Sequence, residues 1–168
     1  MPSAAQHQRF QDLMEQHQGL LFKVAHTYCP NESDRQDLLQ EMRIQIWQSM
    51  PRYREQFSLS TWLYRIALNV AISFYRKNTA RSGQYQNLDE HAPQLAVPEK
   101  SEREQQLNLL EQFIAELREL DKALMLLYLE DRSHAHIADI LGMSVSNVGT
   151  RIGRIKEKLK QRFTQQHN

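Results

Sequence analysis

The sequence has a single cysteine, Cys29, and only five glycines and five prolines among its 168 residues. One cysteine excludes an internal disulfide and a cluster of thiolates around a metal ion. No apolar run approaches the roughly 20 residues that span a bilayer, and the N-terminal segment MPSAAQHQRF lacks the apolar core of a secretion signal. These absences predict a cytoplasmic protein that does not insert into a membrane.

Patterns typical of catalysis and of metal binding are missing as well. The serines, histidines and carboxylates show no catalytic spacing, so we expect a protein that is not an enzyme and needs no cofactor. His26 and Cys29 lie three apart on a predicted helix, but two ligands do not make a metal site and a core position is favoured. The same interpretation applies to His134 and His136, so the sequence predicts no metal.

A strong excess of either charge is also absent, since 21 basic and 20 acidic side chains give a net charge of +1. The distribution along the chain is uneven. Residues 132–168 carry seven Lys or Arg and two acidic residues, whereas residues 101–131 carry three and eight. A basic segment beside an acidic one steers a polyanion such as DNA towards one surface.

The scarcity of glycine and proline, together with a three-and-four spacing of apolar residues, predicts an all-α protein. We expect two small helical domains, at residues 1–81 and 101–168, of which the second contains a helix-turn-helix. Residues 82–100 hold one glycine and two prolines without periodicity, which is typical of a flexible linker. A tether of about 20 residues lets the domains bind sites several tens of ångströms apart.

Apolar spacing places several helices in these domains. In the first, a helical pair is expected to join near Gly19, a helix from Asp34 to Met50 ends before Pro51, and Ser60 is expected to cap the next helix. The predicted inward stripe of that helix is Leu63, Ile66, Val70 and Phe74. The corresponding stripe in the second domain is Leu107, Leu110, Ile114 and Leu117. A short apolar helix follows from Leu120 to Leu129, and then a turn in which Asp131 tolerates a left-handed conformation.

The segment 133–159 is typical of a helix-turn-helix that continues into a longer helix. Ile137 and Leu141 lie four apart on one apolar face of the first helix. Gly142 then supplies the turn, because glycine adopts the left-handed conformation without a side-chain clash. Ser144 is expected to cap the second helix through a backbone amide. The coincidence of these features favours DNA binding over an ordinary pair of bundle helices.

The second helix of this motif divides into an apolar and a polar face. Its predicted buried stripe is Val145, Val148, Ile152, Ile155 and Leu159. The polar face offers arginine and asparagine, which read guanine and adenine edges, together with groups that hold phosphates. The DNA-binding candidates are Ser144, Ser146, Asn147, Thr150, Arg151, Arg154, Lys156 and Lys158. A merely solvated charged face is the alternative.

Aromatic and basic residues alternate in the segment 52–81. Aromatic rings stack on unpaired bases, each worth about 1–3 kcal/mol, while nearby cations hold the phosphate backbone. Arg65 and Asn69 lie off the predicted apolar stripe, and Asn69 is suited to reading the edge of a flipped base. For Trp62 and Phe74 a position in the core is the alternative.

The chain resembles the extracytoplasmic-function sigma factors, a two-domain class of bacterial RNA polymerase specificity subunits. The motif D-L-x-Q-E appears as residues 37–41, Trp47 follows, and W-L-Y-R-I-A-x-N appears as residues 62–69. The second typical motif, I-A-x-I-L-G-x-S-x-x-x-V-x-x-R, matches residues 137–151 at every named position. Two motifs in the correct order cover nearly the whole chain.

This resemblance implies partners and site residues. RNA polymerase core would be bound through the clamp helices of its largest subunit and through its flap, and the clamp contacts would be Asp37, Leu38, Gln40, Glu41, Ile44 and Trp47. The melted minus-ten strand of promoter DNA would be held by Phe57, Trp62, Arg65, Asn69, Tyr75, Arg76 and Lys77. The helix-turn-helix would bind the minus-thirty-five duplex. An anti-sigma factor is a further possible partner.

The sequence is also compatible with two other functions. A sigma-factor mimic would sequester an anti-sigma protein without contacting promoters, and a dimeric helix-turn-helix repressor would bind duplex DNA alone. The basic recognition face argues against the first and the aromatic segment against the second. The sequence also departs from the family at Gly149 and Gly153, each of which costs about 0.5–1 kcal/mol in a helix interior relative to alanine.

Overall fold

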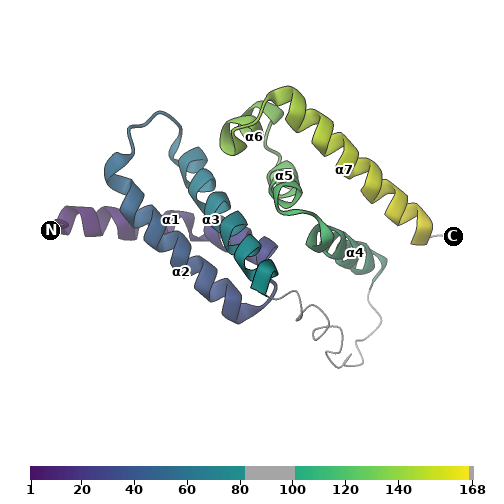
Figure 1. Cartoon of the computed structure of the whole chain (residues 1–168), viewed down its shortest axis with the longest axis horizontal. Coiled ribbons are helices and arrows are strands. Elements are labelled where there is room, and N and C mark those ends of the chain that lie inside the picture. The colour runs from purple at the N-terminus through teal and green to yellow at the C-terminus, as the bar shows by residue number, and fades with distance from the viewer. Residues whose placement is uncertain (82–100, 167–168) are drawn as a thin grey trace.

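The computed structural model describes residues 1–81 and 101–166, and every regular element within these ranges is helical (Figure 1). The all-α prediction is therefore confirmed. The elements are α1 (Ala4–Tyr28), α2 (Glu32–Ser49), the 3₁₀ turn η1 (Met50–Arg52), α3 (Leu59–Arg81), α4 (Glu102–Glu116), α5 (Glu119–Leu129), α6 (His134–Leu141) and α7 (Val145–Gln166). The predicted linker at 82–100 lies outside the described residues, and the domain boundaries remain a prediction. Among the described helices none is long and apolar enough to cross a membrane.

The N-terminal half begins with a kinked helix rather than a pair of helices. Ser3 and Gln6 form a capping box at the start of α1. The non-helical residue is His17, with φ −121° and ψ 15°, two positions before the predicted join at Gly19. The Asn31 side chain accepts hydrogen bonds from two backbone amides and caps α2, so this helix starts two residues before Asp34.

Two details predicted for α3 are wrong. Ser58, not Ser60, caps the helix, because its Oγ accepts the Thr61 amide hydrogen at 3.2 Å. The deeply buried face consists of Leu63, Tyr64, Ala67, Leu68 and Ala71, whereas Ile66, Val70 and Phe74 are half-buried. This rotation has a tertiary cause: α3 packs against α1 and α2 and also against α5 and α6.

In the C-terminal half the two predicted left-handed turns are confirmed, whereas the predicted buried stripes of α4 and α7 are wrong in part. Gly142 adopts φ 69° and ψ 36°, and Asp131 adopts φ 63°, so both left-handed positions occur as predicted. In α4 the buried face consists of Leu109 and Phe113 and is continued by Leu117, while Leu107 is exposed. Val145, the first residue of α7, is 51% exposed, so the buried stripe of this helix begins at Val148.

The two halves pack directly against each other. Figure 1 shows α3 beside α5 and α6, and α1 and α3 both contact α5. The buried apolar residues of both halves form one continuous cluster, which runs from Leu38 and Met42 through Ala71 to Leu124 and Ile137. The helices predicted for two tethered domains thus share a single core.

Candidate nucleic-acid interface

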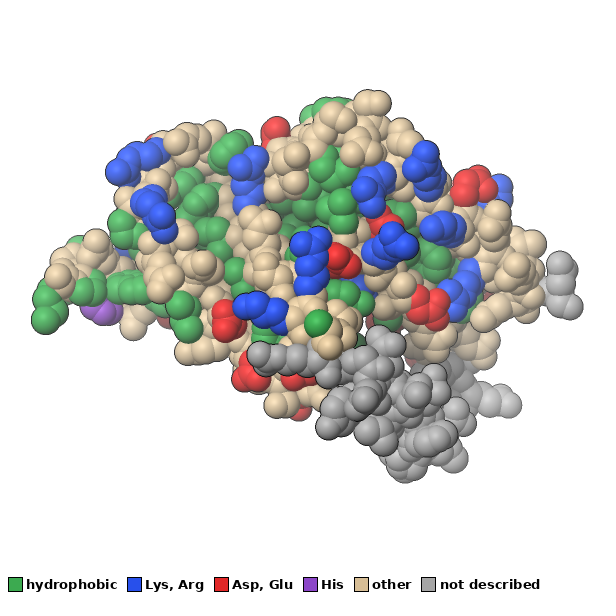
Figure 2. All heavy atoms as spheres, viewed as in Figure 1, with side chains coloured by type: hydrophobic (Ala, Val, Ile, Leu, Met, Phe, Trp, Pro, Cys, Tyr) green, Lys and Arg blue, Asp and Glu red, His purple; other side chains and the backbone are tan. Residues whose placement is uncertain are grey.

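One face of α7 is polar and exposed to solvent. Ser146, Asn147, Thr150, Arg154 and Lys158 are all exposed and repeat with helical spacing on this face. Lys and Arg side chains gather over this part of the molecule in Figure 2. The helix is held from its other side by Val148, Ile152 and Ile155, which are buried. The packing of α7 therefore presents its polar residues to solvent as a row.

Three residues predicted to contact the duplex have other partners in this structure. The Ser144 Oγ accepts the Asn147 amide hydrogen at 3.1 Å and so caps α7, as predicted. Arg151 is half-buried and its Nη2 donates to Asp121 Oδ1 on α5 at 3.3 Å. Lys156 Nζ lies 5.0 Å from the centroid of the Tyr128 ring. Arg151 and Lys156 thus flank the exposed polar row on α7 instead of belonging to it.

A groove between α2 and α3 collects polar and apolar side chains in the N-terminal half. Its volume is about 750 Å³. The α3 side contributes Asn69, Lys77 and the half-buried Phe74, and the α2 side contributes Glu41 and Gln48. Asn69 is exposed at the rim, so its amide is accessible to a ligand in the groove. Amide, cation and ring together suit an unpaired nucleotide.

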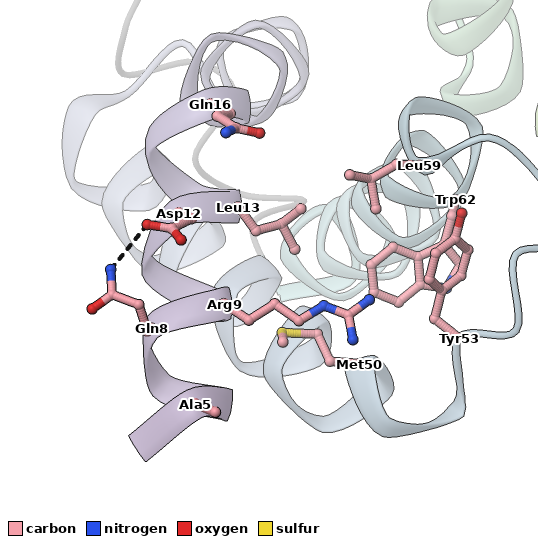
Figure 3. A pocket seen from close by; sticks show the side chains of 10 residues that line it. All are labelled: Ala5, Gln8, Arg9, Asp12, Leu13, Gln16, Met50, Tyr53, Leu59 and Trp62. Carbon is pink, nitrogen blue, oxygen red and sulfur yellow. Dashed lines mark hydrogen bonds between the residues drawn. The ribbon is translucent and has the colours of Figure 1, made fainter. Parts of the chain in front are cut away.

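A second cavity of about 430 Å³ lies between α1 and the start of α3 (Figure 3). Trp62 lines it, packed against Tyr53 with ring centroids 4.8 Å apart. Arg9 extends from α1 towards this aromatic pair in Figure 3. Trp62 is half-buried, so part of its ring packs in the protein and part is accessible to a ligand. Both predictions for this residue, a core position and a base-stacking position, therefore agree with the structure in part.

The remaining residues predicted for the melted strand already have partners in the structure. The Arg65 guanidinium lies 4.0 Å from the centroid of the Phe57 ring, and its Nε donates to the Asp139 carbonyl oxygen at 2.8 Å. Arg76 Nε donates to Glu119 Oε1 at 2.8 Å. Tyr75 is half-buried, and burial followed by the Glu119 charge raises the pKa of its hydroxyl. Only part of the predicted set is thus open to a ligand.

The exposed face of α2 carries most of the residues predicted to contact polymerase. Asp37, Gln40, Glu41 and Ile44 follow helical spacing and are exposed, and Ile44 keeps 48% of its surface. Leu38 is a correction, because it is fully buried in the core and unavailable to a partner. Trp47 is half-buried, with its ring 5.0 Å from that of His7 and 5.3 Å from that of Phe10.

Sequence reasoning missed an apolar groove of about 610 Å³ between α4, α5 and α7. Its apolar lining is Leu110, Met125, Tyr128, Leu129, Leu159 and Phe163. Leu129, the last residue of the largely apolar helix α5, is 51% exposed. The sequence did contain an indication of this groove. Helix α5 has apolar residues on several of its sides, and a single packing contact cannot bury all of them.

Comparison with known proteins identifies the family. Sigma-70 region 2 matches residues 13–81, and Sigma-70 region 4 matches residues 107–159. The ECF sigma factor SigW of Bacillus subtilis is 26% identical over 165 residues, covering 92% of this chain and 88% of that protein. The ECF sigma-E factor of Haemophilus influenzae is 28% identical over 144 residues, covering 79% and 76%. This chain is an extracytoplasmic-function sigma factor.

Solved structures of sigma factors share the fold of this sigma factor. The structure of CnrH in complex with the cytosolic domain of CnrY aligns with a TM-score of 0.67 at 21% identity, covering 94% of this chain and 89% of that one. RpoE from Bartonella quintana, in complex with the anti-sigma factor NepR, aligns with a TM-score of 0.59 at 18% identity, covering 93% and 97%. As a sigma factor, the chain directs RNA polymerase to promoters.

Proposed function

We propose that this sigma factor divides promoter recognition between two modules, defined as α1–α3 (the strand module) and α4–α7 (the duplex module). The duplex module binds the minus-thirty-five element and the strand module captures the melted minus-ten strand. The observation that carries this division is the coexistence of an exposed polar row on α7 with the groove that holds Asn69 and Lys77.

The α7 row has the chemistry for reading paired DNA. A recognition helix inserts its exposed side into the major groove, where each base pair presents a distinct set of donors and acceptors. Arg154 and Asn147 supply donors for guanine and adenine edges, and Lys158 supplies a charge for a phosphate. Arg151 and Lys156 lie at the edges of this row, and we assign them to flanking phosphates.

The groove between α2 and α3 has the chemistry for an unpaired base. A flipped base exposes its Watson–Crick edge, and the Asn69 amide offers both a donor and an acceptor to that edge. Phe74 supplies a partly exposed ring, and Lys77 supplies a cation within the same groove. Capture of a base here favours the opened duplex, because the paired state leaves the groove empty.

Core polymerase supplies the catalysis, and we assign it two docking surfaces. The exposed face of α2 around Ile44 fits the clamp helices of the largest subunit, with Asp37 and Glu41 setting the charge. The apolar groove between α4, α5 and α7 fits an apolar helix of the polymerase flap. These partners place the protein in the cytoplasm. Because RpoE is bound to an anti-sigma factor in its complex, an anti-sigma partner is proposed here as well.

Run-off transcription with purified core polymerase on a promoter library tests this function. We expect defined transcripts that depend on the protein and share a minus-ten and a minus-thirty-five motif. Transcripts at the level of core polymerase alone, across the whole library, would show that the protein does not act as a sigma factor on its own.

A further inference from the structure

The cavity between α1 and the start of α3 is lined largely by apolar and aromatic side chains (Figure 3). Two of the lining residues, Leu13 and Met50, are buried in the core beneath it, at 8% and 7% exposure. The volume of about 430 Å³ falls within the range of about 300–1,000 Å³ that is typical of small-molecule sites. The proposed division of promoter recognition assigns no ligand to this cavity.

Local hydrogen bonds hold the aromatic wall of the cavity in place. The Tyr53 hydroxyl donates to the Phe57 carbonyl oxygen at 2.6 Å, and the Tyr53 amide donates to the Met50 carbonyl oxygen at 3.2 Å. The ring centroids of Tyr53 and Trp62 are 4.8 Å apart, with an interplanar angle of 36°. Both residues are half-buried. The exposed parts of their rings therefore form a pre-organised surface for stacking, which lowers the entropic cost of binding a flat ligand.

Arg9 is the one cation among the described residues that line the cavity. It is exposed, and no ion pair or hydrogen bond joins its guanidinium to another described residue. In Figure 3 its side chain extends from α1 towards Tyr53 and Trp62. The one lining carboxylate, that of Asp12, accepts a hydrogen bond from Gln8 at 3.0 Å, and Figure 3 shows this pair on the side of α1 away from the rings. An unpaired guanidinium thus lies beside an aromatic surface.

This combination fits a small planar aromatic carboxylate. Arginine binds a carboxylate through two parallel hydrogen bonds, and a flat ring next to that carboxylate stacks in an offset manner on Tyr53 or Trp62. A single guanidinium balances a single negative charge. The second charge of a phosphate monoester would find no further cation in the described lining. The cavity therefore favours an aromatic carboxylate over a nucleotide.

We infer that this cavity is a binding site for a small aromatic carboxylate, with the ring on Tyr53 and Trp62 and the carboxylate on Arg9. The site goes beyond promoter recognition, because its ligand is a free small molecule. Trp62 also belongs to the residues predicted for the melted strand, so a bound carboxylate blocks that ring and weakens strand capture. This regulatory consequence rests on the proposed function, whereas binding of the carboxylate does not.

Nuclear magnetic resonance of the isotope-labelled full chain tests the site. The sequence has two tryptophans, so the indole N–H signals of Trp47 and Trp62 report separately, and a Trp47→Phe variant assigns them. Three probes separate ring from charge: indole-3-acetate has both, indole-3-acetamide lacks the charge, and cyclohexylacetate lacks the aromatic ring. We expect indole-3-acetate to shift the Trp62 signal and to bind at least about fivefold more tightly than either other probe.

The variant Arg9→Ala tests the guanidinium, and Arg43→Ala is its matched control. Arg43 is exposed on α2 of the same module and does not line the cavity. Each variant removes one exposed guanidinium, and helical content by circular dichroism establishes that both fold. Arg9→Ala should weaken binding of indole-3-acetate at least about fivefold and leave binding of the acetamide unchanged. Arg43→Ala should change neither.

Fluorescence anisotropy with a labelled single strand that carries a minus-ten sequence measures the regulatory consequence. Saturating indole-3-acetate is expected to weaken strand binding by wild-type protein about fivefold or more, as the loss of one stacked base would. The same concentration of cyclohexylacetate is expected to have a smaller effect, because it does not occupy the aromatic surface as tightly.

The outcomes separate this inference from the proposed function. A Trp62 signal that does not move at about 5 mM indole-3-acetate, where a ligand of this size is expected to bind, overturns the inference. Equal binding of acetate and acetamide, equal effects of Arg9→Ala and Arg43→Ala, or a shift of Trp47 alone also overturns it. Unchanged strand affinity at saturating indole-3-acetate overturns the regulatory consequence. If no form of the protein binds the strand, the proposed strand capture fails, and the indole signals alone decide the carboxylate site.

Discussion

Arg154 lies near the middle of the exposed row on α7 and has no salt-bridge partner among those found in the described residues. A guanidinium that reads a guanine edge contributes about 1–3 kcal/mol of discrimination. We predict that Arg154→Ala weakens binding to a minus-thirty-five duplex by roughly tenfold or more, measured by anisotropy at fixed salt. Binding to core polymerase should not change.

The matched comparison for Arg154 is Lys156, which lies over the Tyr128 ring at the edge of the same helix. Lys156→Ala removes one positive charge as well, but from a flanking position. We expect a smaller loss of duplex affinity that does not depend on sequence. Equal losses in the two variants would contradict the assignment of Arg154 to base recognition.

Asn69 is an exposed polar residue of α3 in the groove beside α2. We predict that Asn69→Ala reduces formation of the open complex while binding to duplex promoter fragments stays near wild type. The reason is that the amide contacts a base only after the strands separate. Permanganate reactivity of unpaired thymines measures opening, and wild-type reactivity in the variant would rule out this role.

Cys29 shows how burial sets reactivity at a single residue. Desolvation first, and the charge of Asp34 second, raise the pKa of this thiol from 9.0 to about 11. At pH 8 the folded protein thus has roughly 100-fold less thiolate than an unfolded chain. We expect iodoacetamide to modify Cys29 slowly in buffer and rapidly in urea. Mass spectrometry of the modified protein over time measures both rates. Equal rates would show that the thiol is solvated.

The same shift predicts the direction of a stability change at alkaline pH. Because the folded pKa lies above the unfolded one, the folded state binds more protons between about pH 9 and 11, and the free energy of unfolding falls as pH rises through this window. The raised pKa values of Tyr28 and Tyr64, both caused mainly by burial, act in the same direction at higher pH.

At the scale of elements, the sequence predicted the turns at Asp131 and Gly142 and the cap at Ser144 correctly. It misplaced the cap of α3 and parts of the buried faces of α3 and α4. The left-handed turns at Asp131 and Gly142 and the cap at Ser144 depend on a few adjacent residues, so the sequence specified them. The buried faces of α3 and α4 depend on which neighbours pack against them. In α4, leucines at 107, 109 and 110 fit two registers equally, and only the contact with α5 and α1 selects Leu109.

Helix α7 contains two glycines, Gly149 and Gly153, which differ in the space available for a side chain. A Cβ at Gly153 would meet nothing within 4 Å, whereas a Cβ at Gly149 would lie 3.4 Å from His134 Nδ1 on α6. We predict that Gly153→Ala raises the free energy of unfolding by about 0.5–1 kcal/mol, since alanine loses less backbone entropy. Gly149→Ala should raise the free energy of unfolding by less, because its Cβ would lie against the His134 ring. Urea denaturation of the two variants provides the measurement, and destabilisation by Gly153→Ala would refute the argument.

At the scale of the whole molecule, the sequence predicted which residues are chemically suited to DNA but not which are free. Motif spacing pointed to Arg65 and Arg76, and it contained no information on their contacts with Asp139 and Glu119, more than 40 residues away. Long-range contacts of this kind arise from the packing of whole helices. The same limit explains why Leu38 was assigned to a surface although it lies in the core.

The shared core predicts that the two modules unfold together. Both tryptophans, Trp47 and Trp62, lie in the strand module, so fluorescence reports on that module alone. Circular dichroism reports on helices of both modules. If α3 and α5 share one apolar cluster, the two probes should give the same urea midpoint, as expected for a single cooperative transition.

The variant Glu119→Lys/Glu130→Lys places cations opposite Arg76 and Lys23. It should separate these transitions, because each module then unfolds with less support from the other. The control Glu111→Lys/Glu116→Lys makes the same change in net charge within α4, where Glu116 pairs with Arg162 of the same module, and should keep the two midpoints coincident. Different midpoints for the two probes in wild-type protein would mean that the modules are independent in solution, and the contacts between α3 and α5 would then contribute little to stability. Coincident midpoints in the Glu119→Lys/Glu130→Lys variant would instead assign the coupling to apolar packing alone.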